Sequence, residues 1–413
     1  MTITAVKGFN DILPGESQVW RLIEETAWRV FSSYGYAEIR LPIVEKTELF
    51  LRSIGETTDI VEKEMYSFAD RHGDGLTLRP EGTASAVRAY IEHKLYARPV
   101  TRLFYRGPMF RYERPQKGRY RQFYQIGAEA LGEAHPRMDA EAIEMLMRFF
   151  GELGLPGAVL NVNSLGCPEC RPVYKERLIK FLDGVKDRLC ENCRRRLGTN
   201  PLRALDCKGH GCIEATGAAP PITDALCAGC KDHFDRVRSA LHERGTEAAV
   251  NHRMVRGLDY YTKTTFEITS TGLGAQNAVA AGGRYDGLVA DLGGPATPCF
   301  GFAVGMERLA LLLNEAGIKG EAPPMSAFIA LGGEAAKTGV GLVRRWREAG
   351  VPVVEVLGDG GLKSGMKKAD RLGAAYAIIL GEDELKAGVV TVKDMKTAEQ
   401  RQVKWDEAAG HIK

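Results

Sequence analysis

The sequence predicts an α+β fold, in which a main domain built on an antiparallel sheet precedes a smaller α/β domain. Short strand-like segments alternate with amphipathic helices up to about residue 162. The composition then becomes cysteine-rich, and the later linker "GEAPPM" precedes regular alternation of strands and helices. We therefore predict one domain formed by 1–162 and 251–320, an insertion at 163–250 and a separate domain at 325–413.

Composition limits the class of protein. The 413 residues are 44% hydrophobic and 26% charged, which is typical of a globular protein with sizeable cores. Lys and Arg number 56 against 53 Asp and Glu, so we expect any polyanion to be bound locally. No apolar run reaches the roughly 20 residues that span a bilayer. "MTITAVKGFNDILPG" lacks a signal-peptide core, so we expect a cytoplasmic protein without membrane contact.

The first part of the chain contains three segments with clear patterns. "ESQVWRLIEETAWRVFSSYGY" places Val19 and Ile23 at helical spacing, and Gly35 ends the predicted helix. "EIRLPIVEKTELF", residues 38–50, follows as an extended segment that is interrupted by Pro42. "RPEGTASAVRAYIEHKLY" is typical of a turn that enters a helix.

A cationic hairpin is predicted next. Strand-like arms at 103–112 and 120–126 flank a polar loop at 115–118, and Gln125 and Glu129 follow the cations. The cations are Arg111, Arg114, Lys117, Arg119 and Arg121. Guanidinium groups on a rigid hairpin can grip phosphates with bidentate bonds, which favours a nucleotide triphosphate as ligand. The alternative is a solvated edge hairpin whose arginines deter aggregation.

Beyond the linker, strands and helices alternate and a hairpin ends the chain. The predicted strands are 327–331, 351–357 and 375–380, the helices 334–349 and 362–372, and the hairpin 389–403. This α/β domain of roughly 90 residues has an ordinary domain size. Both predicted helices carry several Arg and Lys side chains.

The cysteines are concentrated in the insertion, where eight of the nine form four close pairs. The spacing of the inner set is compatible with a Cys₄ zinc site formed by Cys190, Cys193, Cys207 and Cys212. The outer pairs could close a second site, Cys167/Cys170 with Cys227/Cys230. A structural zinc ion and reduced thiols without metal both remain open. Disulfides are the weaker explanation in a cytosolic chain.

Several quoted segments resemble those of one enzyme class. "FRYERPQKGRYRQFYQIGAE" resembles motif 2 of the class II aminoacyl-tRNA synthetases, "GFAVGMERLALLL" motif 3, and "RLPIVEKTELF" motif 1. Within that class, "RPEGT", "RGLDYYTKTTFEI" and "GGRYDGL" are similar to signatures of the histidyl-tRNA synthetases, and the likeness covers essentially the whole chain.

The resemblance implies a reaction and its partners. Such an enzyme activates L-histidine with ATP and Mg²⁺ to histidyl-adenylate, transfers the histidine to the 3′ end of tRNA(His), and releases AMP and diphosphate. Motif 1 implies a homodimer. The two parts of the main domain would then be catalytic, and 325–413 would bind the anticodon. The insertion would contact the acceptor arm of the tRNA, or its basic residues would only form a solvated face.

The resemblance also assigns an ATP site. Arg111 would contact the α-phosphate and the amino-acid carboxylate, and Arg119 the γ-phosphate. Phe123 and Arg308 would hold the adenine between them, with Glu113 beside it. Arg256 would lie across the α-phosphate, so that the expected catalytic residues are Arg111 and Arg256.

A histidine site follows in the same way. Glu129 and Tyr261 would contact the imidazole, with Tyr285 and Tyr260 nearby, although an aromatic core pair remains the alternative for Tyr260 and Tyr261. The α-amino group would meet Glu81, Thr83 and Gln125, and the carboxylate Arg111 and Arg256. Close approach of backbone to ligand, or simple turn and bulge chemistry, would account for Gly82, Gly127, Gly282 and Gly283.

Other functions remain open at this stage. One is the catalytically inactive regulatory subunit that resembles histidyl-tRNA synthetase and partners ATP phosphoribosyltransferase, and another is a nucleic-acid-binding module. A synthetase for proline, threonine or glycine is a further alternative. The regulatory proteins usually lack the C-terminal domain and parts of the arginine set, whereas this chain keeps them.

Overall fold

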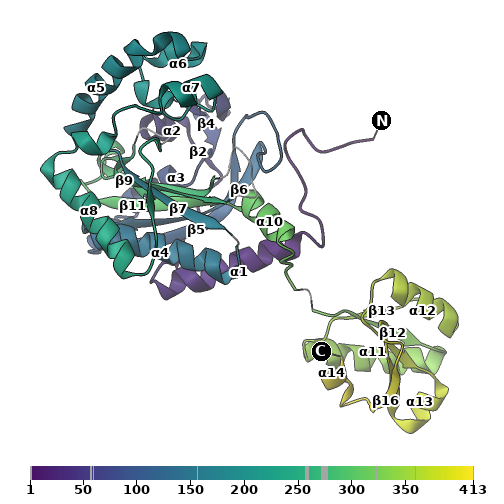
Figure 1. Ribbon diagram of the computed structural model, residues 1–413. Helices are drawn as coiled ribbons and strands as arrows, with labels where there is room; N and C mark the ends of the chain where they lie inside the picture. The colour runs from purple at the N-terminus through teal and green to yellow at the C-terminus, as the bar shows by residue number, and fades with distance from the viewer. Residues whose placement is uncertain are drawn as a thin grey trace. The chain divides into compact units, whose positions relative to one another are not determined.

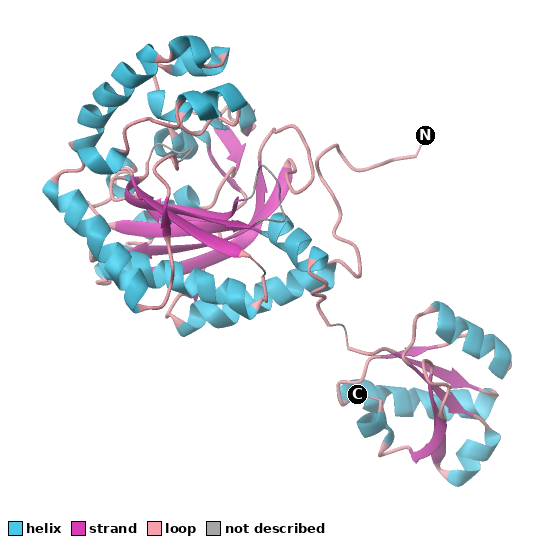
Figure 2. Ribbon diagram, in the orientation of Figure 1, coloured by secondary structure: helices cyan, strands magenta, loops and turns pink. Residues whose placement is uncertain are grey.

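The computed structural model describes residues 2–55, 58, 60–155, 157–255, 260–270, 278–321, 323–358 and 360–412. The chain forms two compact units, Met1–Gly320 and Glu321–Lys413. Figures 1 and 2 show that the first unit is built around one large sheet with helices on both faces. The α+β prediction is confirmed.

The large sheet has eight strands in the order β1-β5-β6-β11-β10-β9-β7-β8. Its neighbours are antiparallel except at its two ends, where β1 pairs with β5 and β7 pairs with β8 in parallel. The strands are β1 (Ala37–Glu38), β5 (Thr101–Phe110), β6 (Gln122–Leu131), β7 (Ala158–Ser164), β8 (Ala249–Val250), β9 (Thr262–Ser270), β10 (Ala278–Arg284) and β11 (Cys299–Gly305).

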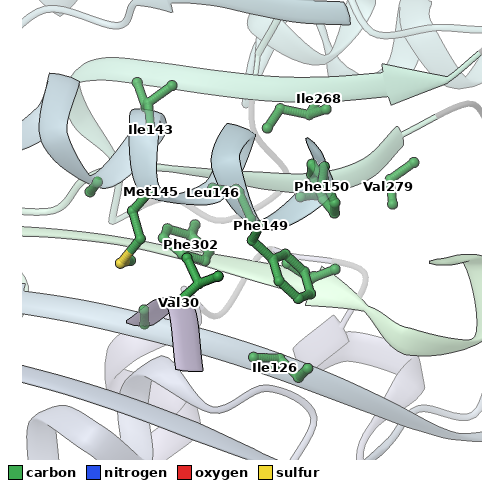
Figure 3. Packing of buried hydrophobic residues seen from close by; sticks show 14 of the residues in the cluster. Val30, Ile126, Ile143, Met145, Leu146, Phe149, Phe150, Ile268, Val279 and Phe302 are labelled. Atoms are coloured by element: carbon green, nitrogen blue, oxygen red, sulfur yellow. The ribbon is translucent and has the colours of Figure 1, made fainter. Parts of the chain in front are cut away.

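Four helices bury one face of this sheet: α1 (Ser17–Ser33), α4 (Pro136–Glu152), α8 (Ala228–Glu243) and α10 (Met306–Glu315). Figure 3 shows Phe149 and Phe150 of α4 with Phe302 of β11 and Ile126 of β6 in this core. The helices are amphipathic, so burying their apolar stripes removes a large apolar area from water and stabilises their packing against the sheet.

The opposite face is covered by α3 (Thr83–Glu92), α9 (Leu288–Asp291) and the insertion. The insertion leaves the sheet after β7 and includes α5 (Cys170–Gly184), α6 (Glu191–Arg196) and α7 (His210–Ala215). In Figure 1 these three teal helices gather on one side of the sheet. The last helix of the predicted insertion, α8, instead packs Phe234 and Val237 into the main core.

A three-stranded sheet flanks the large one, in the order β2 (Val44–Lys46), β4 (Gly75–Leu78) and β3 (Tyr66–Ala69). The extended segment expected at 38–50 is wrong at its end, because α2 (Thr47–Ile54) begins there. Leu49, Phe50 and Ile54 are buried at helical spacing, so burial of one helix face decides the conformation.

The β5–β6 hairpin differs from the prediction in the length of the connection between its arms. The arms run from Thr101 to Phe110 and from Gln122 to Leu131, so the connection spans 111–121 rather than 115–118. Within it, the backbone of Gln116 pairs with that of Arg119. All five cations of the hairpin therefore lie on the connecting loop and not on the arms.

The second unit has a five-stranded sheet in the order β13-β12-β14-β15-β16. Its strands are β12 (Ser326–Ala330), β13 (Val353–Glu355), β14 (Tyr376–Leu380), β15 (Val389–Asp394) and β16 (Gln400–Lys404). Its helices are α11 (Gly333–Glu348), α12 (Leu362–Arg371), α13 (Glu382–Ala387) and α14 (Ala408–His411). The expected alternation is present, and α13 and α14 are additional elements. None of the described helices is long and apolar enough to cross a membrane.

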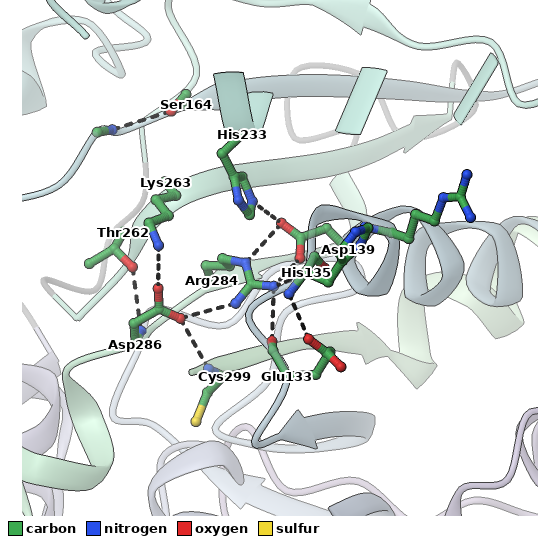
Figure 4. A network of polar contacts seen from close by, with 12 residues as sticks. Glu133, His135, Asp139, Ser164, His233, Thr262, Lys263, Arg284, Asp286 and Cys299 are labelled. Atoms are coloured by element: carbon green, nitrogen blue, oxygen red, sulfur yellow. Dashed lines mark hydrogen bonds and ion pairs between the residues drawn. The ribbon is translucent and has the colours of Figure 1, made fainter. Parts of the chain in front are cut away.

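A buried ionic network joins the large sheet to α4 and α8 (Figure 4). Arg284, at the end of β10, is completely buried and lies 2.7 Å from Asp139 of α4. Asp139 also contacts His233 of α8 at 2.9 Å. On its other side Arg284 lies 3.2 Å from Asp286, which contacts Lys263 at 3.0 Å and accepts a hydrogen bond from the Cys299 backbone. Each buried charge thus has an opposite partner.

Removing the central cation should therefore destabilise the first unit strongly. We expect Arg284→Met to lower the free energy of unfolding by about 3–5 kcal/mol, because Asp139 and Asp286 lose their shared partner. Arg344→Met is the matched control, since Arg344 pairs with Glu348 on the surface at 3.0 Å; it should cost less than about 1 kcal/mol. Urea unfolding measures both, and equal effects would contradict the assignment.

Candidate active site

The alternation of side chains along β6 creates the site. Ile126, Ala128 and Ala130 enter the main core, whereas Gln125 and Glu129 belong to the opposite face. On β9, Phe266 enters the same core and Glu267 borders a cavity on the opposite face. The antiparallel pairing therefore collects polar side chains from several strands on one face of the sheet.

A cavity of about 450 Å³ lies on this face. It is bordered by most of the residues predicted for the two ligands: Glu81, Thr83, Arg111, Glu113, Arg119, Phe123, Gln125, Tyr260, Tyr261 and Arg308. These residues are spread over almost 230 positions of the sequence. Tertiary folding thus brings the predicted ATP and histidine residues to one cavity.

Three arginines converge at one end of the cavity. Arg111 follows β5 and donates from Nε to the Pro80 carbonyl at 2.9 Å. Arg119 forms an ion pair with Glu113, and Arg308 donates to the Ala278 carbonyl at 2.8 Å. Burial lowers the pKa of Arg119 and of Arg308, and repulsion from Arg111 lowers both further. A bound polyanion would reduce the electrostatic repulsion between these three cations.

An aromatic ring lies beside these cations. Phe123, on β6, borders the cavity, and the guanidinium carbon of Arg111 lies 5.3 Å from its ring centroid. Arg308 borders the same cavity from α10. An aromatic face and a guanidinium plane are both suited to contact with a flat base.

Glu81 sits at the start of α3. Its carboxylate oxygens accept hydrogen bonds from the backbone N–H groups of Thr83 at 2.7 Å and Ala84 at 2.8 Å. Burial raises the pKa of Glu81, and the two backbone donors and Arg111 oppose that rise. The helix start thus holds a buried carboxylate at the cavity wall, where it suits a positively charged amino group.

The side-chain amide of Gln125 contains a buried hydrogen-bond acceptor. Its Oε1 atom is buried and has no hydrogen-bond partner among the described residues. Buried polar atoms are rarely left unpaired, and an unpaired one that borders a cavity points to a ligand.

Glu129 is completely buried behind the cavity wall and accepts hydrogen bonds from three hydroxyl groups. The donors are Thr83 at 2.8 Å, Tyr105 at 3.0 Å and Tyr285 at 2.5 Å. Burial raises the pKa of Glu129 to about 8; the nearby Glu81 adds to the rise and the hydroxyl donors oppose it. The carboxyl can therefore change its protonation state near neutral pH.

The tyrosines form a chain of rings that leads from the cavity to Glu129. The centroids of Tyr261 and Tyr260 lie 4.7 Å apart, and those of Tyr260 and Tyr285 lie 5.7 Å apart. Tyr260 and Tyr261 border the cavity. Tyr285 does not border it; its ring contacts that of Tyr260, and its hydroxyl group donates to Glu129.

Three predicted site residues are placed differently from the others, and Arg256 lies outside the described residues. Like Tyr285, the predicted residues Gly82 and Glu129 do not border the cavity. A Cβ at Gly82 would lie 2.1 Å from a ring carbon of Tyr105, and one at Gly127 would lie 2.3 Å from the same ring. The glycines at these positions make room for Tyr105, so the close approach is to protein.

Sequence reasoning missed several residues of the site. Tyr105 holds Glu129, and Gly301 provides the space for it, because a Cβ there would lie 1.6 Å from Glu129 Oε2. Glu267 borders the cavity from β9, and Arg203 and Asp206 border it from the insertion. Alternation in "TKTTFEI" was a signal for Glu267, whereas no local pattern pointed to Arg203 or Asp206.

The structure also brings together the four cysteines predicted for the inner zinc site of the insertion. The sulfur atoms of Cys190, Cys193, Cys207 and Cys212 all lie within 4.8 Å of one another.

The antiparallel sheet, the three facing arginines and the separate α/β unit define a class II aminoacyl-tRNA synthetase. The profile of the histidyl-tRNA synthetase family matches residues 8–169 and 202–309, and that of an anticodon-binding domain matches 326–413. The chain belongs to the histidyl-tRNA synthetase family.

Individual relatives agree with this membership. A histidine–tRNA ligase of Geobacter metallireducens is 58% identical over 100% of both chains, and one of Geobacter sulfurreducens is 58% identical over 97% of each. The apo histidyl-tRNA synthetase of S. aureus is 37% identical, with a TM-score of 0.82 over 100% of both chains. The protein is thus an aminoacyl-tRNA ligase that activates histidine with ATP and transfers it to tRNA(His).

The raised pKa of Glu129 predicts a pH-dependent stability. Its pKa of about 8 in the folded protein exceeds the ordinary glutamate value, so its contribution to stability is full at low pH and is lost as pH rises through about 8. In Glu129→Gln this loss should be absent. Relative to the variant, the native protein should lose roughly 1 kcal/mol per pH unit between about pH 6 and 8.

Urea unfolding at several pH values measures this difference. Glu348→Gln is the control, because Glu348 is an exposed carboxylate paired with Arg344. Its stability should run parallel to that of the native protein. A parallel curve for Glu129→Gln as well would disprove the raised pKa.

Proposed function

We propose that ATP and L-histidine occupy this cavity, with the triphosphate at Arg111 and Arg119 and the adenine at Arg308. The observation that supports this most directly is the convergence of three guanidinium groups at one end. Glu81 and Thr83 border the same cavity. The opposite charges of the arginines and Glu81 would orient the substrates relative to each other.

In the first reaction an oxygen of the histidine carboxylate attacks the α-phosphorus of ATP, the bond to the β-phosphate oxygen breaks, and diphosphate leaves. The carboxylate is already ionised, so no general base is needed. Arg111 neutralises charge that grows on the α-phosphate and holds the carboxylate. Arg256 has the same role in this proposal on the strength of the resemblance. The tRNA 3′-terminal hydroxyl then attacks the carbonyl carbon, and AMP leaves.

Class II synthetases use ATP with Mg²⁺, and the cavity offers oxygen ligands that suit this ion. Glu113 and Glu267 border the cavity, the former beside Arg119. We assign Glu267 and Glu113 as the groups that would hold Mg²⁺, which screens the charge of the phosphates when bound. Glu113 thus has a different role in this proposal from the contact beside the adenine that the resemblance implies. Phe123 and Arg308 hold the adenine between them.

Glu129 gives the site its preference for histidine. As a carboxylate, Glu129 can accept a hydrogen bond from an imidazole N–H that reaches it behind the cavity wall, and Tyr261 borders the cavity with a second polar group. A side chain without ring nitrogens would leave these buried groups unpaired, which costs far more than a lost apolar contact. Gln125 Oε1 receives the α-amino group together with Glu81.

The proposed domains follow from these roles. Residues 1–162 and 251–320 carry out adenylation, 163–250 contacts the acceptor arm of tRNA, and 325–413 binds the anticodon. The match of 326–413 to an anticodon-binding domain supports the last role. Arg203 and Asp206, which border the cavity from the insertion, support a role of the insertion close to the acceptor end.

We also propose that the enzyme is a cytoplasmic homodimer with zinc at Cys190, Cys193, Cys207 and Cys212. Exposed apolar side chains on the motif 1 segment and its neighbour, Ile43, Val44 and Phe68, support pairing through this region. The described cysteines are all free, as in a reducing compartment. Sedimentation of the purified protein at nanomolar concentration tests the dimer.

A pair of substitutions in one loop tests the ATP site. Arg119→Ala should lower kcat/KM for ATP in histidine-dependent ATP/diphosphate exchange by about 100-fold, because a preorganised cation is lost. Lys117 lies two residues away but is exposed and pairs with Glu315 at 2.9 Å. Lys117→Ala should therefore stay within about twofold of the native value. Equal losses in both variants would show a loop effect instead.

Truncation tests whether residues 325–413 are needed for charging of tRNA but not for adenylation. A chain that ends at Gly320 keeps both cores of the first unit and the whole cavity. Its histidine-dependent exchange should stay within about tenfold of that of the full chain, whereas charging of tRNA should fall much further, because distant contacts help to position the acceptor end. If the folded truncated protein charges tRNA as well as the full chain does, residues 325–413 do not have the proposed role.

A further inference from the structure

The insertion contains two clusters of four cysteines that are built in the same way. The inner cluster is Cys190, Cys193, Cys207 and Cys212, and the outer cluster is Cys167, Cys170, Cys227 and Cys230. Within each cluster all four sulfur atoms lie within 4.8 Å of one another. The two clusters are thus formed by different parts of the chain, and the outer one joins the start of the insertion to its end.

The spacing of the sulfur atoms fits a tetrahedral metal ion. Zinc–sulfur bonds of about 2.3 Å in a tetrahedron place the sulfur atoms about 3.8 Å apart. The observed separations include 3.5 Å for Cys167 to Cys170, 3.9 Å for Cys167 to Cys227 and 3.9 Å for Cys190 to Cys207. Disulfides would instead draw the sulfurs into pairs at about 2.0 Å.

The surroundings of the sulfur atoms favour the thiolate form that zinc requires. Cys190 precedes α6 and Cys227 precedes α8 at the N-cap position. In each cluster a backbone N–H donates to a sulfur, from Cys190 to Cys212 and from Cys227 to Cys170, both at 3.1 Å. Helix N-termini and N–H donors of this kind stabilise thiolates and orient metal ligands.

Residues next to each cluster are hydrogen-bonded to one end of the segment that contains Tyr260 and Tyr261. Beside the outer cluster, Leu165 N–H donates to the Lys263 carbonyl at 2.7 Å and Lys263 N–H to the Gly166 carbonyl at 2.8 Å. Beside the inner cluster, Arg253 donates to the carbonyls of Ile213 at 2.8 Å and Leu205 at 3.2 Å.

We propose that both clusters are structural zinc sites, and that together they fix the flanks of this segment at Arg253 and Lys263. The outer ion closes the base of the insertion against β9. The inner ion fixes the segment before Cys207 and helix α7, which contains Cys212; carbonyls of these two segments hold Arg253. The anchoring role rests on the proposed placement of histidine beside Tyr261, whereas the zinc sites themselves do not depend on it.

Metal content tests the sites directly. The protein purified without added chelator should contain two zinc ions per chain by plasma mass spectrometry. Cys190→Ser and Cys227→Ser, at the two cysteines that cap helices, should each contain one. Cys299→Ser is the control, because Cys299 lies outside both clusters, and it should keep two. A metal-free native protein, or two ions in either cluster variant, would overturn the proposal.

A second measurement covers variants that fail to fold. When the native protein is titrated with a mercurial reagent that displaces zinc from thiolates, a zinc indicator should report release of two equivalents as eight thiols react. Release of no zinc while the same thiols react would also overturn the sites.

The anchoring role has its own test. Arg253→Ala should keep two zinc ions and raise KM for histidine in the exchange reaction about tenfold, since a small displacement at a binding site has effects of this order. Arg238→Ala, an exposed arginine of α8, is the control and should change neither quantity. Two ions with an unchanged KM in Arg253→Ala would overturn the anchoring role alone.

Discussion

The buried ion pair between Arg284 and Asp139 is the constraint on which the other parts of the first unit depend. Both side chains are fully buried, so neither charge is tolerable without the other. The pair fixes the end of β10 against α4, and the next residue, Tyr285, then reaches Glu129. The residue after it, Asp286, binds Lys263, whose backbone pairs with the base of the insertion. One ionic network thus connects the core, the Tyr285–Glu129 contact behind the cavity and the base of the insertion.

Two different electrostatic environments at the cavity follow from the sheet. Loop and helix positions bring Arg111, Arg119 and Arg308 together, and burial and repulsion from Arg111 both lower the pKa of Arg119 and of Arg308. Behind the cavity wall, the alternation on β6 buries Glu129 among hydroxyl groups, and burial raises its pKa to about 8. A polyanion bound beside the arginines would reduce the repulsion between them. The free protein is therefore less stable at its site than it would be with substrates bound.

The insertion differs in how it is held together. Its helices α6 and α7 are short and its apolar core is continuous with residues of α3 and the sheet. Short helices of this kind gain little stability by themselves, so packing has to supply it. This explains how Arg203 and Asp206, distant in sequence from β6, border the same cavity. It also places the cysteine clusters beside the catalytic unit rather than in an independent module.

The sequence by itself determined the α+β class, the α/β character of the last 90 or so residues, and membership of the family, because these depend on local periodicity and on motifs that are contiguous in the chain. It also pointed to Gln125 and Glu129, whose alternation on β6 is a local property. Only the tertiary structure decided that Thr47 begins a helix, that Tyr105 fills the space above Gly82 and Gly127, and that Gly301 makes room for Glu129. Those outcomes depend on burial and on steric contact between strands far apart in the sequence, which no local pattern records.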